Sequence, residues 1–276
     1  MEKDYNFLLL CASTIVFGGC VPLDEASLPK AQASRAMQAP YKELYPGYKS
    51  NESLHFVVKA YSSETTQRYS SLCEEDYQRI MVDLGIYSFV PSKPYNIVIY
   101  GDAAEYHLKT SQPAWSGGIT YGNAILIYDF EGSPGILAHE MTHLVFNEFM
   151  GLSAPESLRW LNEGIAVYEQ MRADYPSKAS YEGKIASDIS LNPIPFSQMM
   201  NLVPRGENDA MVERWYAQAG SVASFMLRQG GSLNFSYFLG RLKDGQGLDE
   251  AAAASFGGLW KDMKDVERTW LLEIKR

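Results

Sequence analysis

The stretch that decides the fold is SPGILAHEMTHLVFNEFMG, residues 133–151. It contains the pattern His-Glu-x-x-His at residues 139–143, and apolar side chains surround this pattern on almost every side of a helix. Ser133 suits an N-cap, Pro134 suits the first helical turn, and Gly151 is typical of a helix end. The stretch therefore predicts one buried helix.

The spacing of the two histidines allows both to bind one metal ion. Residues four apart share a helix face, so His139 and His143 can each point a ring nitrogen at the same ion. Glu140 projects beside them and can take a proton from a metal-bound water. Two histidines with one carboxylate and an open position suit zinc, so we predict a Zn2+ site with Glu140 as general base. The alternative is a core helix with incidental histidines.

A third ligand is expected from Glu163, in the segment WLNEG. Ser153 and Glu156 form a capping box, which predicts a second helix starting near residue 154. The short link makes the two helices antiparallel. At 1.5 Å per residue, His143 lies about 10 Å and Glu163 about 13 Å from the turn, so the carboxylate is expected to reach the metal. The alternative for any glutamate is a solvated position.

The segments HEMTH and WLNEGIAVYEQ together resemble the gluzincin metallopeptidases, in particular the peptidase MA-like group. The resemblance covers roughly residues 95–275. It implies a zincin-like fold in which His139, His143 and Glu163 bind zinc while Glu140 activates water for peptide-bond hydrolysis. The metzincin family is disfavoured because no third histidine follows at its spacing.

Tyr216 is the candidate for stabilising the oxyanion of the reaction. Gluzincins use a Tyr or His from their helical part for this purpose, and Tyr216 lies near the start of a predicted helix. The alternative is a core aromatic beside Trp215. His107 and His55 are weaker candidates.

The expected substrate is a peptide or protein. The β-rich runs 119–121 and 124–128 precede the histidine helix, where gluzincins present an edge strand. Such an edge can pair with an extended peptide backbone. Gly117, Gly118 and Gly122 would permit close approach, although simple turn chemistry explains them equally well.

The remaining patterns predict an α+β fold, with a small mixed sheet whose edge strand packs on the active-site helix and a mainly helical C-terminal part. We expect one domain over 51–276, with the sheet and active helices in 51–175 and a helical subdomain in 176–276. Further strands are expected at 54–60 and 95–100. Helices are expected at 64–84, 103–109, 134–149, 155–172, 209–229, 232–242, 247–255 and 259–274.

The N-terminus predicts export. The apolar run 7–17 is too short to span a bilayer, which needs about 20 residues, but it suits a signal peptide. The ending FGGC resembles the lipobox of bacterial lipoproteins, which implies a signal peptide at 1–19, a lipidated Cys20 and a tether over 20–50. The protein would then be anchored in the cell envelope, on the periplasmic or extracellular face. An ordinary signal peptide or a buried first helix are the alternatives.

Composition narrows the classes of protein. A net charge of −9 argues against a nucleic-acid partner. A charged fraction of 21% with 13% aromatics excludes a disordered chain, and three cysteines exclude a disulfide scaffold. Two further hypotheses stand beside the peptidase. One is a catalytically silent gluzincin-like lipoprotein that acts as a binding or assembly module, and the other is a structural lipoprotein without metal.

Overall fold

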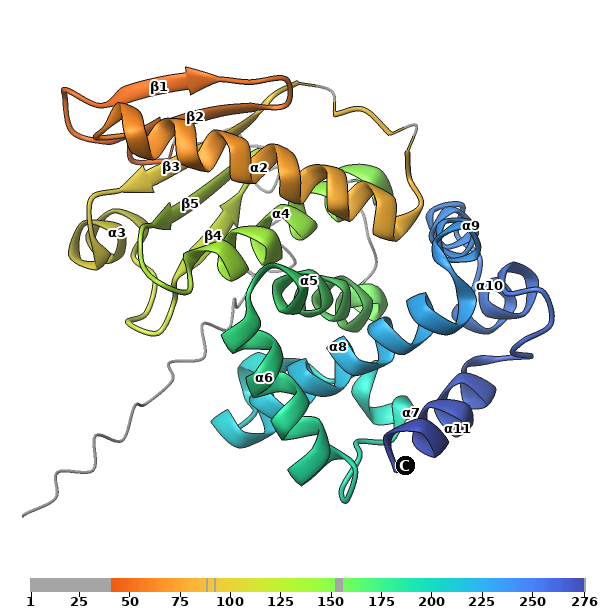
Figure 1. Ribbon diagram of the computed structural model, residues 1–276. Coiled ribbons are helices and arrows are strands. Elements are labelled where there is room, and N and C mark those ends of the chain that lie inside the picture. The colour runs from red at the N-terminus through yellow and green to blue at the C-terminus, as the bar shows by residue number, and fades with distance from the viewer. Residues whose placement is uncertain (1–40, 88, 92, 152–155, 276) are drawn as a thin grey trace, which may run out of the picture.

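The computed structural model describes residues 41–87, 89–91, 93–151 and 156–275. The predicted signal peptide, Cys20, most of the predicted tether and Ser153 lie outside the described residues. A sheet with three covering helices forms the first half of the described chain, and a group of helices forms the second (Figure 1). This arrangement confirms the predicted α+β class.

Five strands form one mixed sheet in the order β1-β2-β3-β5-β4. The three inner strands are parallel, and the two edge strands run antiparallel to their neighbours. The strands are β1 (Lys49–Glu52), β2 (Phe56–Ala60), β3 (Tyr95–Tyr100), β4 (Gly118–Tyr121) and β5 (Ala124–Tyr128). Because β4 is an edge, one side of its backbone has no strand partner in the described sheet.

Near-continuous buried runs in the inner strands β3 and β5 give the sheet two apolar faces, as expected for parallel strands. One face packs beneath α2 (Ser63–Leu84) and α4 (Ser133–Met150) and joins the main core. The other face forms a smaller core with α3 (Ala103–Thr110) and the segment around Leu44. On the first of these faces, α4 packs against β4 and β5.

The helical half is built around α5 (Arg159–Ala173), which packs against α4 and also against α8 (Asp209–Gly230). The contact between α5 and α8 is close. A β-carbon at Gly164 would lie 2.5 Å from the carbonyl oxygen of Ala219, and one at Gly220 would lie 2.3 Å from Val167 Cγ1. The other helices are α6 (Tyr175–Lys184), a π-helical turn (Ile185–Ile189), α7 (Phe196–Met199), α9 (Ser232–Lys243), α10 (Leu248–Ser255) and α11 (Met263–Ile274).

Several predicted boundaries shift. The run 95–100 is a strand as predicted, whereas the helix expected at 259–274 starts at Met263, where Asp262 caps it. Strand β1, helix α6 and the π-helical turn were not predicted. The predicted tether boundary at residue 50 lies inside β1, and Leu44 is already buried.

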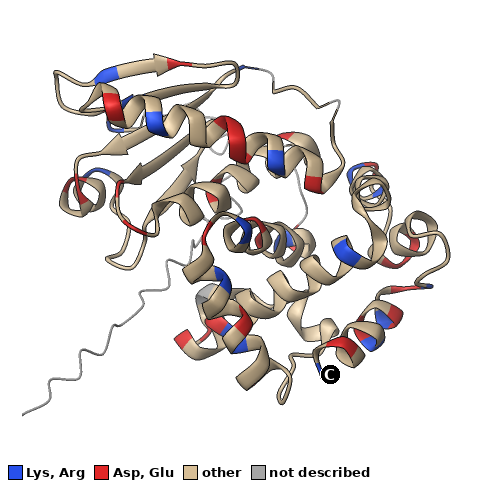
Figure 2. Cartoon of the chain, in the orientation of Figure 1, with Lys and Arg blue, Asp and Glu red and all other residues tan. Residues whose placement is uncertain are grey.

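Acidic and basic residues are interleaved along α2 and α11 (Figure 2). Within the part of the chain that the structure describes, no helix is both long enough and apolar enough to cross a membrane.

Candidate metal centre

Helix α4 contains the His-Glu-x-x-His pattern, and most of its residues are buried. The residues His139, Glu140 and His143 are each at most 5% exposed. The helix ends at Gly151 as predicted, but its N-cap is Gly132 and not Ser133. The Ser133 hydroxyl lies instead 2.7 Å from the Tyr69 hydroxyl on α2, so it joins the two helices rather than capping one.

Helix α5 starts later than predicted. A 3₁₀ turn (Glu156–Leu158) precedes it, and the α-helix begins at Arg159 rather than near residue 154. Its N-cap is the buried Leu158, which provides no side-chain cap. Glu163 nevertheless lies on the α4 side of α5, because the close contact at Gly164 holds this part of α5 in the core.

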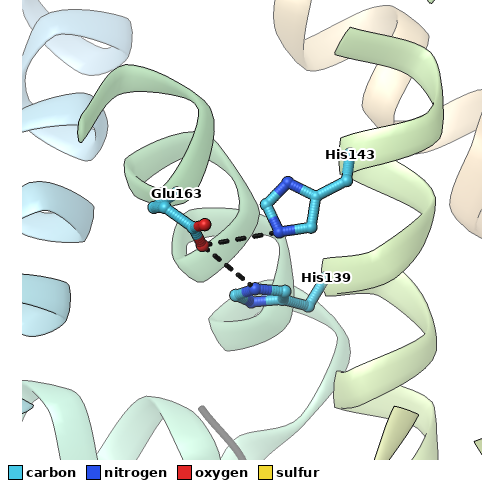
Figure 3. A group of neighbouring side chains, drawn as sticks. All are labelled: His139, His143 and Glu163. Carbon is cyan, nitrogen blue, oxygen red and sulfur yellow. Dashed lines mark ion pairs between the residues drawn. The ribbon is translucent and has the colours of Figure 1, made fainter. Parts of the chain in front are cut away.

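The structure brings three side chains to one point (Figure 3). Glu163 Oε2 lies 3.5 Å from His139 Nε2 and 3.4 Å from His143 Nε2. One ligand atom from each residue lies within 4.8 Å of the others, and all three side chains are buried. This group could hold a metal ion.

The three atoms that face one another lack other partners. His139 Nε2, His143 Nε2 and Glu163 Oε2 are buried, and none has a hydrogen-bond partner among the described residues. A buried polar atom left unpaired costs about 1–3 kcal/mol. A single cation between the three atoms would satisfy all of them, so the residues present fit a metal ion.

The outer nitrogen of each ring is held by a neutral amide. His139 Nδ1 lies 3.0 Å from Gln170 Oε1, and His143 Nδ1 lies 2.9 Å from Asn162 Oδ1. Because a carbonyl oxygen only accepts, each Nδ1 donates to its amide, and each Nε2 is the ring nitrogen that can bind a metal. The sequence reasoning missed both amides, although Asn162 directly precedes Glu163 and Gln170 lies two helical turns after it.

His143 and Glu163 each favour the charged form of the other. Burial acts to lower the pKa of His143, but the negative charge of Glu163, with Glu140 and Asn162, raises it to about 9. Burial acts to raise the pKa of Glu163, but the two histidines lower it to about 2. Without a metal the pair is therefore ionised, and a cation would take the place of the His143 proton.

Glu140 faces the edge strand. Its carboxylate Oε2 accepts a hydrogen bond of 2.8 Å from the hydroxyl of Thr120 on β4. A β-carbon at Gly118 would lie 2.7 Å from Ile136 Cγ2 and 3.5 Å from Glu140 Cγ, so glycine is what allows β4 to approach α4 here. The predicted packing of an edge strand on the histidine helix is thus confirmed.

Three further residues were candidates for stabilising the oxyanion, namely Tyr216, His55 and His107. Tyr216 is buried on α8, with its ring edge-to-face against Trp215 at 5.1 Å, and its role stays a prediction. His55 pairs with Glu74 on α2, and the ring of His107 packs against Tyr106. We therefore leave His55 and His107 out of the site.

The metal centre lies in a part of the chain that matches a known protein family. The sequence model of the Peptidase MA superfamily matches residues 78–275, a range that includes every residue of the metal centre. The chain belongs to the Peptidase MA superfamily. Membership supports a metal-dependent peptidase at the level of the superfamily. No curated protein matches the chain.

Proposed function

We propose that this superfamily member is a zinc-dependent peptidase that hydrolyses peptide bonds with Glu140 as general base. The observation that carries the proposal is the convergence of three buried ligand atoms, none with a hydrogen-bond partner among the described residues, beside an intact Glu140. Tetrahedral zinc with bonds of 2.0–2.1 Å places its ligand atoms about 3.4 Å apart. The two separations from Glu163 Oε2, 3.5 and 3.4 Å, match that spacing.

Each residue then has a defined task. His139, His143 and Glu163 would hold the ion, which when bound supplies a Lewis acid and lowers the pKa of water. Glu140 takes a proton from the attacking water and gives it to the leaving amine nitrogen. We assign the stabilisation of the oxyanion to Tyr216.

The edge strand supports a peptide as substrate. Strand β4 pairs with β5 on one side, and an extended peptide can add to its other side. The strand lies directly against Glu140 through Gly118 and Thr120. A peptide bound along β4 would therefore run past the proposed base.

We also propose that Cys20 anchors the protein in a bacterial membrane through lipid. The FGGC ending supports this proposal, and 23 residues separate Cys20 from Leu44, the first buried residue in the described part of the chain, so the domain could stand clear of the bilayer. Metabolic labelling with a fatty-acid analogue tests it. Labelled wild type and unlabelled Cys20→Ala are expected, and equal labelling of both would contradict the anchor.

Hydrolysis of a peptide library by the zinc-loaded protein tests the function. We expect Glu140→Gln to abolish cleavage while zinc stays bound, because the base is not a ligand. Glu148→Gln, on the same helix and paired with Tyr95, is the matched control and should keep activity. Activity that survives in Glu140→Gln would overturn the mechanism. Zinc binding with no cleavage by wild type would support the binding or assembly module instead.

A further inference from the structure

Thr120 connects the edge strand to the proposed base. Its half-buried hydroxyl lies 2.8 Å from Glu140 Oε2 and 2.9 Å from the main-chain oxygen of the same residue. Gly118 lies on the same face of β4, two residues earlier, and lets the strand come this close. Thr120 is thus a side chain of the edge strand β4 that reaches Glu140 on α4.

The hydroxyl has one proton to donate and two acceptors within reach. The main-chain oxygen of Glu140 lies inside α4, where the helix already provides it with an amide donor four residues on. The carboxylate is charged, and a hydrogen bond to a charged acceptor is about twice as strong as one to a neutral acceptor. The proton therefore goes to the carboxylate.

We propose that Thr120 is a positioning residue that holds the carboxylate of Glu140 in place through this hydrogen bond. The inference rests on the proposed function of Glu140. With Oε2 engaged by Thr120, Oε1 is the oxygen that takes the proton from water. Thr120 belongs to the strand on which a peptide would pair. The same strand, β4, would therefore position both the carboxylate of Glu140 and the backbone of the substrate.

Kinetics of three variants test the role. Thr120→Val keeps the shape and removes the hydroxyl, so kcat should fall about 10- to 100-fold while KM changes by no more than about threefold. Thr120→Ser restores the hydroxyl and should restore kcat. Thr66→Val, which removes a hydroxyl bonded to a main-chain oxygen on α2, is the matched control. A normal kcat in Thr120→Val, or no rescue by Thr120→Ser, would overturn the proposal.

Stability of the metal-free protein provides a readout that needs no activity. In wild type, Thr120→Val should lower the midpoint of thermal unfolding by about 3–10 °C. In Glu140→Met, which lacks the acceptor, the same change should lower it by about 1 °C or less. Equal losses in both backgrounds would place the proton on the main-chain oxygen and overturn the proposal. Thr120→Ala serves the same comparison should Thr120→Val fail to fold.

The two experiments separate this inference from the proposed function. If wild type cleaves no peptide, the proposed function fails, and the coupling between Thr120 and Glu140 is still decided by unfolding. If wild type cleaves peptides and the coupling is absent, the positioning role alone fails.

Discussion

At the scale of single residues, the two neutral amides behind the histidines orient the metal centre. Gln170 and Asn162 each accept from an Nδ1, and neither carries a charge. Residues in such positions fix the tautomer and the direction of the ring. The histidine pattern predicted where a metal would bind, but the partners of its outer nitrogens depend on how α5 is rotated against α4.

Removing one amide should weaken zinc binding without unfolding the protein. We expect Gln170→Ala to lower zinc affinity about 10- to 100-fold, because His139 loses the acceptor that fixes its ring. Competition with a coloured chelator measures the affinity. Gln229→Ala, a glutamine of α8 that bonds Glu273, is the control. Equal affinity in Gln170→Ala and wild type would show that the amide does not orient the ring.

The coupled charges predict how pH acts on the centre. The pKa of His143 is raised to about 9 and that of Glu163 is lowered to about 2, so their pairing stabilises the metal-free fold fully between the ordinary values of about 4.5 and 6.5, and this stability is lost as pH rises to 9. Zinc replaces that proton, so its stabilising effect should grow over the same range. Unfolding midpoints with zinc and with chelator, compared from pH 6.5 to 9, test this. A constant difference would contradict the raised pKa.

At the scale of elements, the close contact of α5 with α8 sets the position of Glu163. Runs of β-forming residues and helical periodicity predicted most strands and helices, because those patterns follow from which faces of each element are buried. They could not predict the late start of α5 or the existence of α6. Those depend on contacts with distant segments, such as Gly164 against Ala219.

Gly164→Ala should destabilise the protein. The new β-carbon would lie 2.5 Å from a main-chain oxygen, and a helix backbone cannot move as a side-chain end does. We expect a loss of about 1–3 kcal/mol in the free energy of unfolding, measured with denaturant. Gly183→Ala on α6 meets nothing within 4 Å and should be neutral or stabilising. A neutral Gly164→Ala would contradict the close packing.

At the scale of the whole molecule, a buried ionic group joins the sheet half to the helical half. Arg79 on α2 pairs with Asp76 at 2.7 Å and with Glu169 on α5 at 3.1 Å. Burial, followed by the charge of Asp83, raises the pKa of Glu169 to about 8 although Arg79 acts to lower it. Removing Arg79 alone leaves the buried carboxyl groups of Asp76 and Glu169 without the cation that both contact, which is costly. Nothing in the sequence pattern pairs these three residues, since 90 positions separate Arg79 from Glu169.

Arg79→Leu should therefore lower the free energy of unfolding by about 3–5 kcal/mol. Denaturant unfolding measures the loss. Arg79→Leu combined with Asp76→Leu and Glu169→Leu should recover much of the stability, because no unpaired charge then remains. A loss in Arg79→Leu no larger than that of the exposed Arg268→Leu would contradict the role of the group.

Zinc K-edge X-ray absorption of protein purified without chelator tests the central claim most directly. The account predicts one zinc per chain, with two histidine nitrogens and one carboxylate oxygen at about 2.0–2.2 Å, and loss of the ion in His139→Ala. A protein without stoichiometric metal, or the same zinc spectrum in wild type and Glu163→Ala, would contradict it.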